Sequence, residues 1–274
     1  MSKLGQHNPP ILTRTCVLLA ATLLAILGVT STAGATQQSI RYVALGDSYS
    51  SGVGAGGYFE SSGDCLRSPN AYPALWVNAH EVASFTFAAC SGATTADVLA
   101  GQIGVLSERT TLVTISIGGN DAGFADVMTT CVLGSEQTCL ERVAEAKEFA
   151  RNVLPGRLDE VYATLRQHAP NAEIIVLGYP RFYELNGSCW VGLSETKRAA
   201  INSGADVLAE VTAKRVANAG LTFVDMRGPF TGHEICSDDW WLHSLEWFSI
   251  IESYHPTTEG HALGYLPALT SVTG

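Results

Sequence analysis

Short apolar segments rich in β-branched and aromatic residues alternate with amphipathic segments along most of this 274-residue chain. Near-continuous apolar strands separated by helices are typical of a parallel sheet that is covered on both faces. The alternation therefore predicts one α/β domain, a three-layer α/β/α sandwich with a five-stranded parallel sheet. The predicted strands are Tyr42–Leu45, Phe85–Ala88, Thr111–Ile117, Glu173–Leu177 and Leu221–Val224.

Helices are expected between and after these strands. The predicted helices are Asn70–His80, Thr95–Gln102, Thr138–His168 with a break near Pro155, Glu195–Ala219 and a last helix within Thr257–Leu269. In a parallel sheet the carboxyl ends of the strands share one edge, so residues that follow different strands converge there.

The first residues have the layout of a secretory signal peptide. A positively charged start is followed by an uncharged apolar run and by a small-residue Ala-Gly-Ala sequence that ends at Ala35. We expect residues 1–35 to be a signal peptide, cleaved after Ala35, and residues 36–274 to form the single domain of a secreted, extracellular protein. No transmembrane segment is expected in that domain, because no later run is long and apolar enough to cross a bilayer.

The exported part of the chain is acidic. The whole chain has a formal net charge of −10, and the expected signal peptide carries only the two positive charges of Lys3 and Arg14. An acidic surface argues against nucleic acid and against electrostatic docking on anionic lipid.

Six of the seven cysteines lie beyond the expected signal peptide. An even number in an oxidising compartment favours three disulfide bonds. Sequence alone does not select one pairing. We expect the sequential one, in which each bond ties down a loop: Cys65–Cys90, Cys131–Cys139 and Cys189–Cys236. A zinc site is the competing interpretation, but there is no C-x-x-C spacing and no His-rich cluster beside the cysteines.

Four short motifs lie at or beyond predicted strand ends or just before the last helix. They are Gly46-Asp47-Ser48, Cys90-Ser91-Gly92-Ala93, Gly118-Gly119-Asn120-Asp121 and Glu252-Ser253-Tyr254-His255-Pro256. Each alone is a common turn sequence. Together they bring a serine, which needs a base to act as a nucleophile, to the same edge as a histidine whose ordinary pKa suits that task.

These four motifs, in this order, resemble those of the GDSL esterase/lipase family, also called the SGNH hydrolases. The likeness runs from Tyr42 to the C-terminal helix and implies a flavodoxin-like SGNH hydrolase fold. It implies a serine esterase or lipase that forms an acyl-enzyme on Ser48, with His255 as base. It also implies an oxyanion hole made by the N–H groups of Ser48 and Gly92 and the amide of Asn120, with no cofactor and no metal.

The cysteines resemble those of the secreted actinobacterial branch of that family, in which three disulfides are sequential. That branch contains lipases and phospholipases, so the resemblance implies carboxylic esters as substrates, with lipid acyl esters first among them. We expect a monomer that acts on a small-molecule or lipid ester.

The third catalytic position departs from the family pattern, which places an aspartate three residues before the histidine. Glu252 stands there, and its carboxylate can orient the imidazole. The main-chain carbonyl of Ser253 is the alternative, which would give a Ser–His dyad. Asp47 is interpreted as a turn or helix-cap residue. The rival base, His261, is interpreted as a surface or packed histidine.

Two other functions stay open. One is a polysaccharide acetylesterase or an acyltransferase that uses the same site. The other is a catalytically silent surface-binding protein that keeps the fold.

The aromatic segment Trp240–Phe248 has two interpretations. It is either a loop packed on the core or a wall for an acyl chain.

Overall fold

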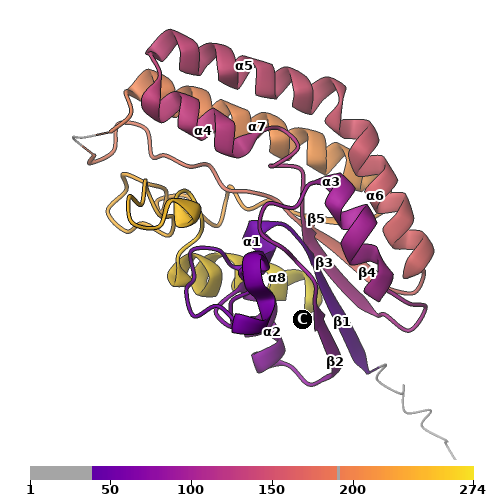
Figure 1. The fold of residues 1–274 in the computed structure, drawn as a ribbon. Helices are drawn as coiled ribbons and strands as arrows, with labels where there is room; N and C mark the ends of the chain where they lie inside the picture. Colours follow the sequence, from indigo (N-terminus) through magenta and orange to yellow (C-terminus); the bar gives the residue numbers. More distant parts are fainter. Residues whose placement is uncertain (1–38, 190–191) are drawn as a thin grey trace, which may run out of the picture. The chain divides into compact units, whose positions relative to one another are not determined.

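The computed structural model describes residues 39–189 and 192–274, so the expected signal peptide and its cleavage site lie outside the described residues. In the described part, five strands form one all-parallel sheet in the order β2-β1-β3-β4-β5, as predicted (Figure 1). This is the flavodoxin-like strand order. The strands are β1 (Ile40–Gly46), β2 (Val82–Phe87), β3 (Leu112–Ser116), β4 (Glu173–Leu177) and β5 (Thr222–Val224).

Helices separate the strands along the chain. The α-helices are α1 (Ser48–Ser51), α2 (Tyr72–Ala79), α3 (Thr95–Asp97), α4 (Phe124–Leu133), α5 (Glu136–Asn152), α6 (Leu154–His168), α7 (Glu195–Asn218) and α8 (Leu266–Thr273). Short 3₁₀ or π-helical turns are η1 (Glu60–Cys65), η2 (Val98–Gln102), η3 (Ile103–Val105), η4 (Ile250–Glu252) and η5 (Gly260–Tyr265). No described helix has the length and apolar character needed to span a bilayer.

Alternate residues of the strands pack into two core clusters, one on each face of the sheet. Along β1, Tyr42 and Ala44 pack with residues of α2 and α8. Val43 and Leu45 pack instead with residues of η2 and α6. The central strands β1, β3 and β4 are mostly buried on both faces and are therefore mostly apolar, whereas Ala83 and Ser84 of the edge strand β2 are exposed. This explains why they could be recognised in the sequence and confirms the three-layer arrangement.

Helix α4 was not predicted from the sequence. Its β-branched residues, Val127, Thr129, Thr130 and Val132, give it weak intrinsic helix propensity. It begins after Gly123, which adopts a left-handed conformation with φ of 77°. A smaller difference concerns the long helical segment predicted between the third and fourth strands. The predicted break near Pro155 falls at Val153, which places the proline in the first turn of α6, where it is well tolerated.

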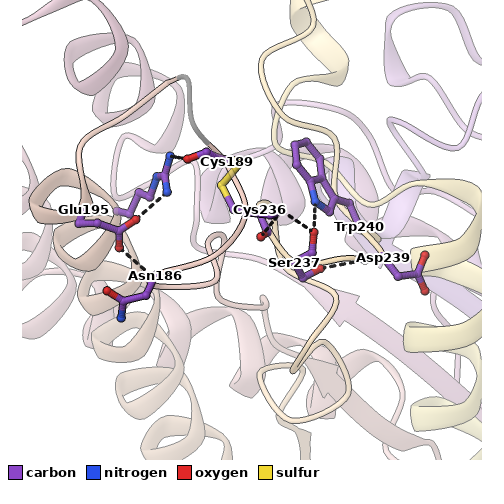
Figure 2. The surroundings of a disulfide bond; sticks show 9 residues. Asn186, Cys189, Glu195, Cys236, Ser237, Asp239 and Trp240 are labelled. Atoms are coloured by element: carbon purple, nitrogen blue, oxygen red, sulfur yellow. Dashed lines mark hydrogen bonds and ion pairs between the residues drawn. A yellow bond between two sulfur atoms is a disulfide. The ribbon is translucent and has the colours of Figure 1, made fainter.

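Three disulfide bonds join the cysteines in sequence order: Cys65–Cys90, Cys131–Cys139 and Cys189–Cys236. Figure 2 shows the third, which ties the loop before α7 to the segment that follows β5. Around it, Trp240 Nε1 donates to the carbonyl of Ser237 at 2.6 Å. The backbone N–H of Asn186 donates to Glu195 at 3.0 Å.

Candidate active site

Ser48 stands on a tight turn where β1 ends and α1 begins. Gly46, the last residue of β1, has φ of 118°, and a Cβ there would collide with the Ser116 carbonyl oxygen of β3. Only glycine fits this position. Asp47 then caps α1, accepting the N–H of Tyr49 at 3.0 Å, so its interpretation as a helix cap is confirmed. The turn holds Ser48, which is 7 % exposed, at the carboxyl edge of the sheet.

His255 lies against Ser48. Its Nε2 is 2.8 Å from Ser48 Oγ, and its Nδ1 is 3.0 Å from the main-chain oxygen of Ser253. Tyr254, between them, has φ of 64°, and this left-handed turn brings the Ser253 carbonyl back to the ring. A carbonyl only accepts hydrogen bonds, so it fixes the ring proton on Nδ1. The lone pair of Nε2 is then directed at the Ser48 hydroxyl.

Burial keeps His255 neutral. Removal from water lowers its pKa to about 4, and the nearby His243 acts in the same direction. The hydrogen bond to the Ser253 carbonyl opposes the shift without reversing it. A neutral imidazole is the form that accepts a proton from a serine hydroxyl.

Glu252 has a different partner. Its carboxylate accepts the hydroxyl of Tyr58 at 2.5 Å, and that hydroxyl accepts the N–H of Gly54 at 2.9 Å. Burial and the bond to Glu252 raise the pKa of Tyr58 to about 12, so the phenol keeps its proton. The Tyr58 hydroxyl therefore links Glu252, three residues before His255, to Gly54 in the loop that follows α1. Of the two candidates for the third position, the Ser253 carbonyl is the group on the imidazole.

Gly92 and Asn120 line the same cleft as Ser48 and His255. Gly92 has φ of 77°, and no atom lies within 4 Å of the position that its Cβ would take. The Asn120 side chain is oriented by its Nδ2, which donates to the Ala93 carbonyl at 3.0 Å. Four sequence motifs that are far apart in the chain therefore converge on one edge of the sheet.

Asp121 anchors the Asn120 turn. Its side chain is fully buried and accepts the N–H and the hydroxyl of Thr95, at 2.9 and 2.6 Å. Arg157 of α6 pairs with it at 2.9 Å. A buried carboxylate needs such partners, and here they come from α3 and α6. The turn is thereby fixed to the helices on one face of the sheet.

Two buried tyrosines connect the turns beneath Ser48. The hydroxyl of Tyr179, just after β4, donates to Asp47 Oδ2 at 2.5 Å and accepts the N–H of Gly119 at 3.2 Å. The hydroxyl of Tyr49 donates to the Tyr254 carbonyl at 2.6 Å. Burial raises the pKa of Asp47 to about 7, although the hydrogen bonds that Asp47 accepts from the Tyr179 hydroxyl and the Tyr49 N–H act to lower it. Neither tyrosine was singled out in the sequence, although the position of Tyr179 directly beyond a predicted strand was a usable signal.

The rival base, His261, is a packed residue. It is fully buried, stacks on Tyr72, and its Nδ1 accepts the Tyr72 N–H at 3.3 Å. Burial lowers its pKa to about 3. Among the described residues, no three His, Cys, Asp or Glu side chains gather as metal ligands would.

An apolar cleft of about 380 Å³ opens at Ser48. One wall comes from α4, and the other comes from the chain just before His255, including Leu245, Trp247, Ile250 and Ile251. Within the aromatic segment Trp240–Phe248, the two tryptophans have different surroundings. Trp241 is buried in the core, whereas Trp247 is 69 % exposed and lines the cleft.

A smaller cavity of about 80 Å³ also reaches Ser48. It lies between α4, α5 and α7, and its lining is almost entirely apolar. Phe124 and Met128 of α4 line both spaces, so this unpredicted helix divides the two.

Comparison with known proteins identifies the family to which the chain belongs. The GDSL-like Lipase/Acylhydrolase family matches residues 44–263. Lipase 1 of Streptomyces coelicolor is 57 % identical, over 91 % of this chain and 95 % of that protein. The crystal structure of phospholipase A1 from Streptomyces albidoflavus has a TM-score of 0.84 and 60 % identity, covering 85 % of this chain and 99 % of that one.

The crystal structure of an extracellular lipase from Streptomyces rimosus is similar to the same extent. Its TM-score is 0.83 and its identity 56 %, again over 85 % of this chain and 99 % of that one. The matches cover nearly all of the described domain and of the relatives. The chain therefore belongs to the GDSL-like lipase/acylhydrolase family and is a carboxylic ester hydrolase.

Proposed function

We propose that this protein is a secreted serine hydrolase that cleaves lipid acyl esters through an acyl-enzyme on Ser48. The observation that carries the proposal is the hydrogen-bonded chain from Ser48 Oγ to His255 Nε2 and from His255 Nδ1 to the Ser253 carbonyl. A nucleophile, its base and an orienting group at these distances are the parts that acyl transfer requires.

In the first half of the reaction, Ser48 Oγ attacks the ester carbonyl carbon while its proton moves to His255 Nε2. The tetrahedral intermediate collapses by breaking the bond to the alcohol oxygen, and His255 returns the proton to that oxygen. In the second half a water attacks the acyl-enzyme, with His255 again as base, and releases the carboxylic acid and free Ser48.

The oxyanion is assigned to three donors: the N–H groups of Ser48 and Gly92 and the side-chain amide of Asn120. The amide of Asn120 has two hydrogens, and the Ala93 carbonyl accepts a bond from this nitrogen. That bond fixes the side chain before the substrate arrives. Loss of one such donor typically lowers the rate by about 10²–10³-fold.

The orienting group is assigned to the Ser253 carbonyl, which gives a Ser–His dyad. The position of the Glu252 carboxylate on Tyr58 supports this choice. A carbonyl is neutral, so it stabilises the imidazolium less than a carboxylate does, but it fixes the tautomer and the ring orientation equally well.

Lipid acyl esters are the proposed substrates because the cleft at Ser48 is apolar on both walls. Relatives named lipase and phospholipase A1 support the same choice. Secretion is supported by the signal-peptide layout of residues 1–35, by the three disulfides and by the extracellular lipase of Streptomyces rimosus.

The proposal is tested by labelling and by variants. A fluorophosphonate probe is expected to label the wild-type protein and not Ser48→Ala. His255→Ala is expected to lose at least about 10³-fold in kcat/KM on p-nitrophenyl butyrate. Glu252→Gln, which keeps an acceptor for Tyr58, is expected to stay within about tenfold of wild type. A loss at Glu252→Gln as large as that at His255→Ala would exclude the dyad.

The two alternative functions predict other results. A polysaccharide acetylesterase on this site would hydrolyse acetyl esters and reject longer acyl chains, which a series of p-nitrophenyl esters measures directly. A catalytically silent protein would leave the fluorophosphonate probe unreacted, or would react equally in wild type and Ser48→Ala.

A further inference from the structure

A close backbone contact joins the loop after α1 to the segment that carries His255. A Cβ at Gly54 would lie 2.6 Å from the carbonyl oxygen of Pro256 and 3.1 Å from the Cβ of His255. Gly54 also has φ of 91°, so both its surroundings and its conformation require a glycine. The loop that follows the nucleophile therefore packs directly on the main chain beside the base.

Two side chains bind the polar groups of Gly54. Its N–H donates to the Tyr58 hydroxyl at 2.9 Å, and its carbonyl oxygen lies 2.8 Å from Nε2 of His243. A carbonyl only accepts hydrogen bonds, so Nε2 of His243 must carry the proton of this bond. On the other side of the ring, Nδ1 lies 3.5 Å from a carboxylate oxygen of Glu246. The His243 ring is thus held with Nε2 toward the loop after α1.

The main chain of His243 is bonded to the segment that carries the base. Its N–H donates to the carbonyl of His255 at 2.9 Å, and its carbonyl accepts the N–H of Tyr254 at 3.1 Å. His243 therefore contacts Gly54 through its side chain and His255 through its main chain. One residue in this way connects the loop after the nucleophile to the base.

We propose that His243 is a positioning residue for His255, and that its bond to Gly54 fixes the main chain that orients the base. This role rests on the proposed function of His255 as base. In the dyad the orienting group is the Ser253 carbonyl, and Tyr254, in a left-handed conformation, stands between it and the ring. A side-chain carboxylate could turn toward the imidazole by its own rotation. A carbonyl points at the imidazole only while the backbone is held, and small displacements of a reacting group lower the rate strongly.

His243 acts on the reaction through His255 and not through the substrate. It is not among the described residues that line the cleft or the smaller cavity at Ser48. His255 is the base in both halves of the proposed reaction, so a displaced His255 slows both of them. When formation and hydrolysis of the acyl-enzyme slow together, kcat falls and KM stays nearly unchanged.

Two substitutions of nearly equal size separate the hydrogen bond from the rest of the side chain. The amide of His243→Gln can still donate to the Gly54 carbonyl, whereas His243→Met has no donor. On p-nitrophenyl butyrate we expect His243→Met to lower kcat by about tenfold or more, with KM within about twofold of wild type. We expect His243→Gln to keep kcat within about threefold. Equal kcat values in the two variants, or a change in KM alone, would overturn the proposal.

His233→Met is the matched control. His233 is exposed to a similar extent, 28 % of its side chain against 25 % for His243, and its Nδ1 also lies close to a main-chain oxygen, that of Asp239, at 3.0 Å. It lines neither space at Ser48. We expect its kcat to stay within about twofold of wild type, and urea unfolding compares the stability of all three variants. A loss of kcat in His233→Met as large as that in His243→Met would refute the positioning role.

Nuclear magnetic resonance of the wild-type protein adds a readout that needs no variant. With ¹⁵N-labelled histidine at mildly alkaline pH, where imidazole is neutral, the shifts of the ring nitrogens show which one carries the proton. We expect the proton on Nε2 in His243 and on Nδ1 in His255. A proton on Nδ1 of His243 would refute its bond to Gly54. A wild-type protein that does not hydrolyse the ester would instead contradict the proposed function, which is a separate outcome.

Discussion

His255 is packed against the rings of Tyr49 and Phe124, and this burial lowers its pKa to about 4. Asp47, the residue before Ser48, is buried as well, and its pKa rises to about 7. Burial disfavours the charged form of both groups, so it shifts an imidazole and a carboxyl in opposite directions. The site is therefore built to keep the base neutral.

The first prediction concerns pH. The imidazole acts as a base only when neutral, and a pKa of about 4 keeps it neutral across the mildly acidic range. We expect kcat/KM on a soluble ester to stay near its neutral-pH value down to about pH 5 and to fall by half near pH 4. Far-UV circular dichroism at each pH checks that the fold persists. A half-maximal point near pH 6.5, the ordinary pKa of histidine, would contradict this account.

The second prediction concerns Tyr179, which acts on Ser48 through Asp47 and Gly119. Tyr179→Phe removes the hydroxyl that joins the nucleophile turn to the Asn120 turn. We expect a loss of about 1–3 kcal/mol in the free energy of unfolding, because the buried Asp47 carboxyl keeps fewer partners. We also expect kcat to fall several-fold with KM nearly unchanged, because the turns that carry the reacting groups loosen.

Tyr162→Phe is the matched control for Tyr179→Phe. Tyr162 of α6 is fully buried too, but its hydroxyl has no hydrogen-bond partner among the described residues. Its removal is expected to leave both kcat and stability close to wild type. Urea unfolding and ester hydrolysis measure both variants, and equal effects at the two positions would show that Tyr179 has no positioning role.

Helix α4 forms one wall of each space at Ser48, although its own sequence favours a helix only weakly. Two tertiary contacts near its C-terminus add to the core packing of Val127 and Met128. The Cys131–Cys139 bond joins it to α5. The buried Lys197 of α7 donates to the carbonyls of Cys131 and Gly134, at 2.7 and 2.8 Å. A cation at a helix C-terminus also interacts favourably with the helix dipole.

The third prediction follows from that contact. Lys197→Met keeps the aliphatic part of the side chain but leaves two carbonyls without their charged donor. We expect a loss of about 2–3 kcal/mol in the free energy of unfolding, measured with urea. The exposed Lys214, on the same helix, supplies the control, and Lys214→Met is expected to change stability by less than about 0.5 kcal/mol. A loss at Lys197→Met no larger than that of the control would refute this role for Lys197.

What the sequence could predict at this scale depended on how local the cause was. The strands were recognisable because each is apolar along its own length, and the nucleophile turn because glycine is required where it leaves β1. Helix α4 depends on a distant lysine and a disulfide, so no window of sequence reveals it. Likewise, the choice between Glu252 and the Ser253 carbonyl depends on Tyr58, about two hundred residues away along the chain.

For the molecule as a whole, three disulfides close loops of different length. The cysteines are separated by 47 residues in Cys189–Cys236, by 25 in Cys65–Cys90 and by 8 in Cys131–Cys139. A cross-link stabilises a protein largely by restricting its unfolded chain, and the effect grows slowly with the length of the loop.

The fourth prediction is an order of stability. When both cysteines of a pair are replaced by serine, we expect the free energy of unfolding to fall by about 4 kcal/mol for Cys189–Cys236 and by about 2–3 kcal/mol for Cys131–Cys139. These values follow from the entropy of closing each loop in the unfolded chain. Urea unfolding without reductant gives the values, and a larger loss for Cys131–Cys139 would show that α4 depends on its bond more than on chain entropy.

In the proposed mechanism, an ester on Ser48 joins the two halves of the reaction. Wild-type protein is mixed with excess p-nitrophenyl decanoate, quenched with acid during turnover and analysed by mass spectrometry, intact and after digestion. We expect an added decanoyl group on the peptide that contains Ser48, and none in Ser48→Ala. A wild-type protein that turns over the ester with no adduct, or with the adduct on another residue, would contradict it.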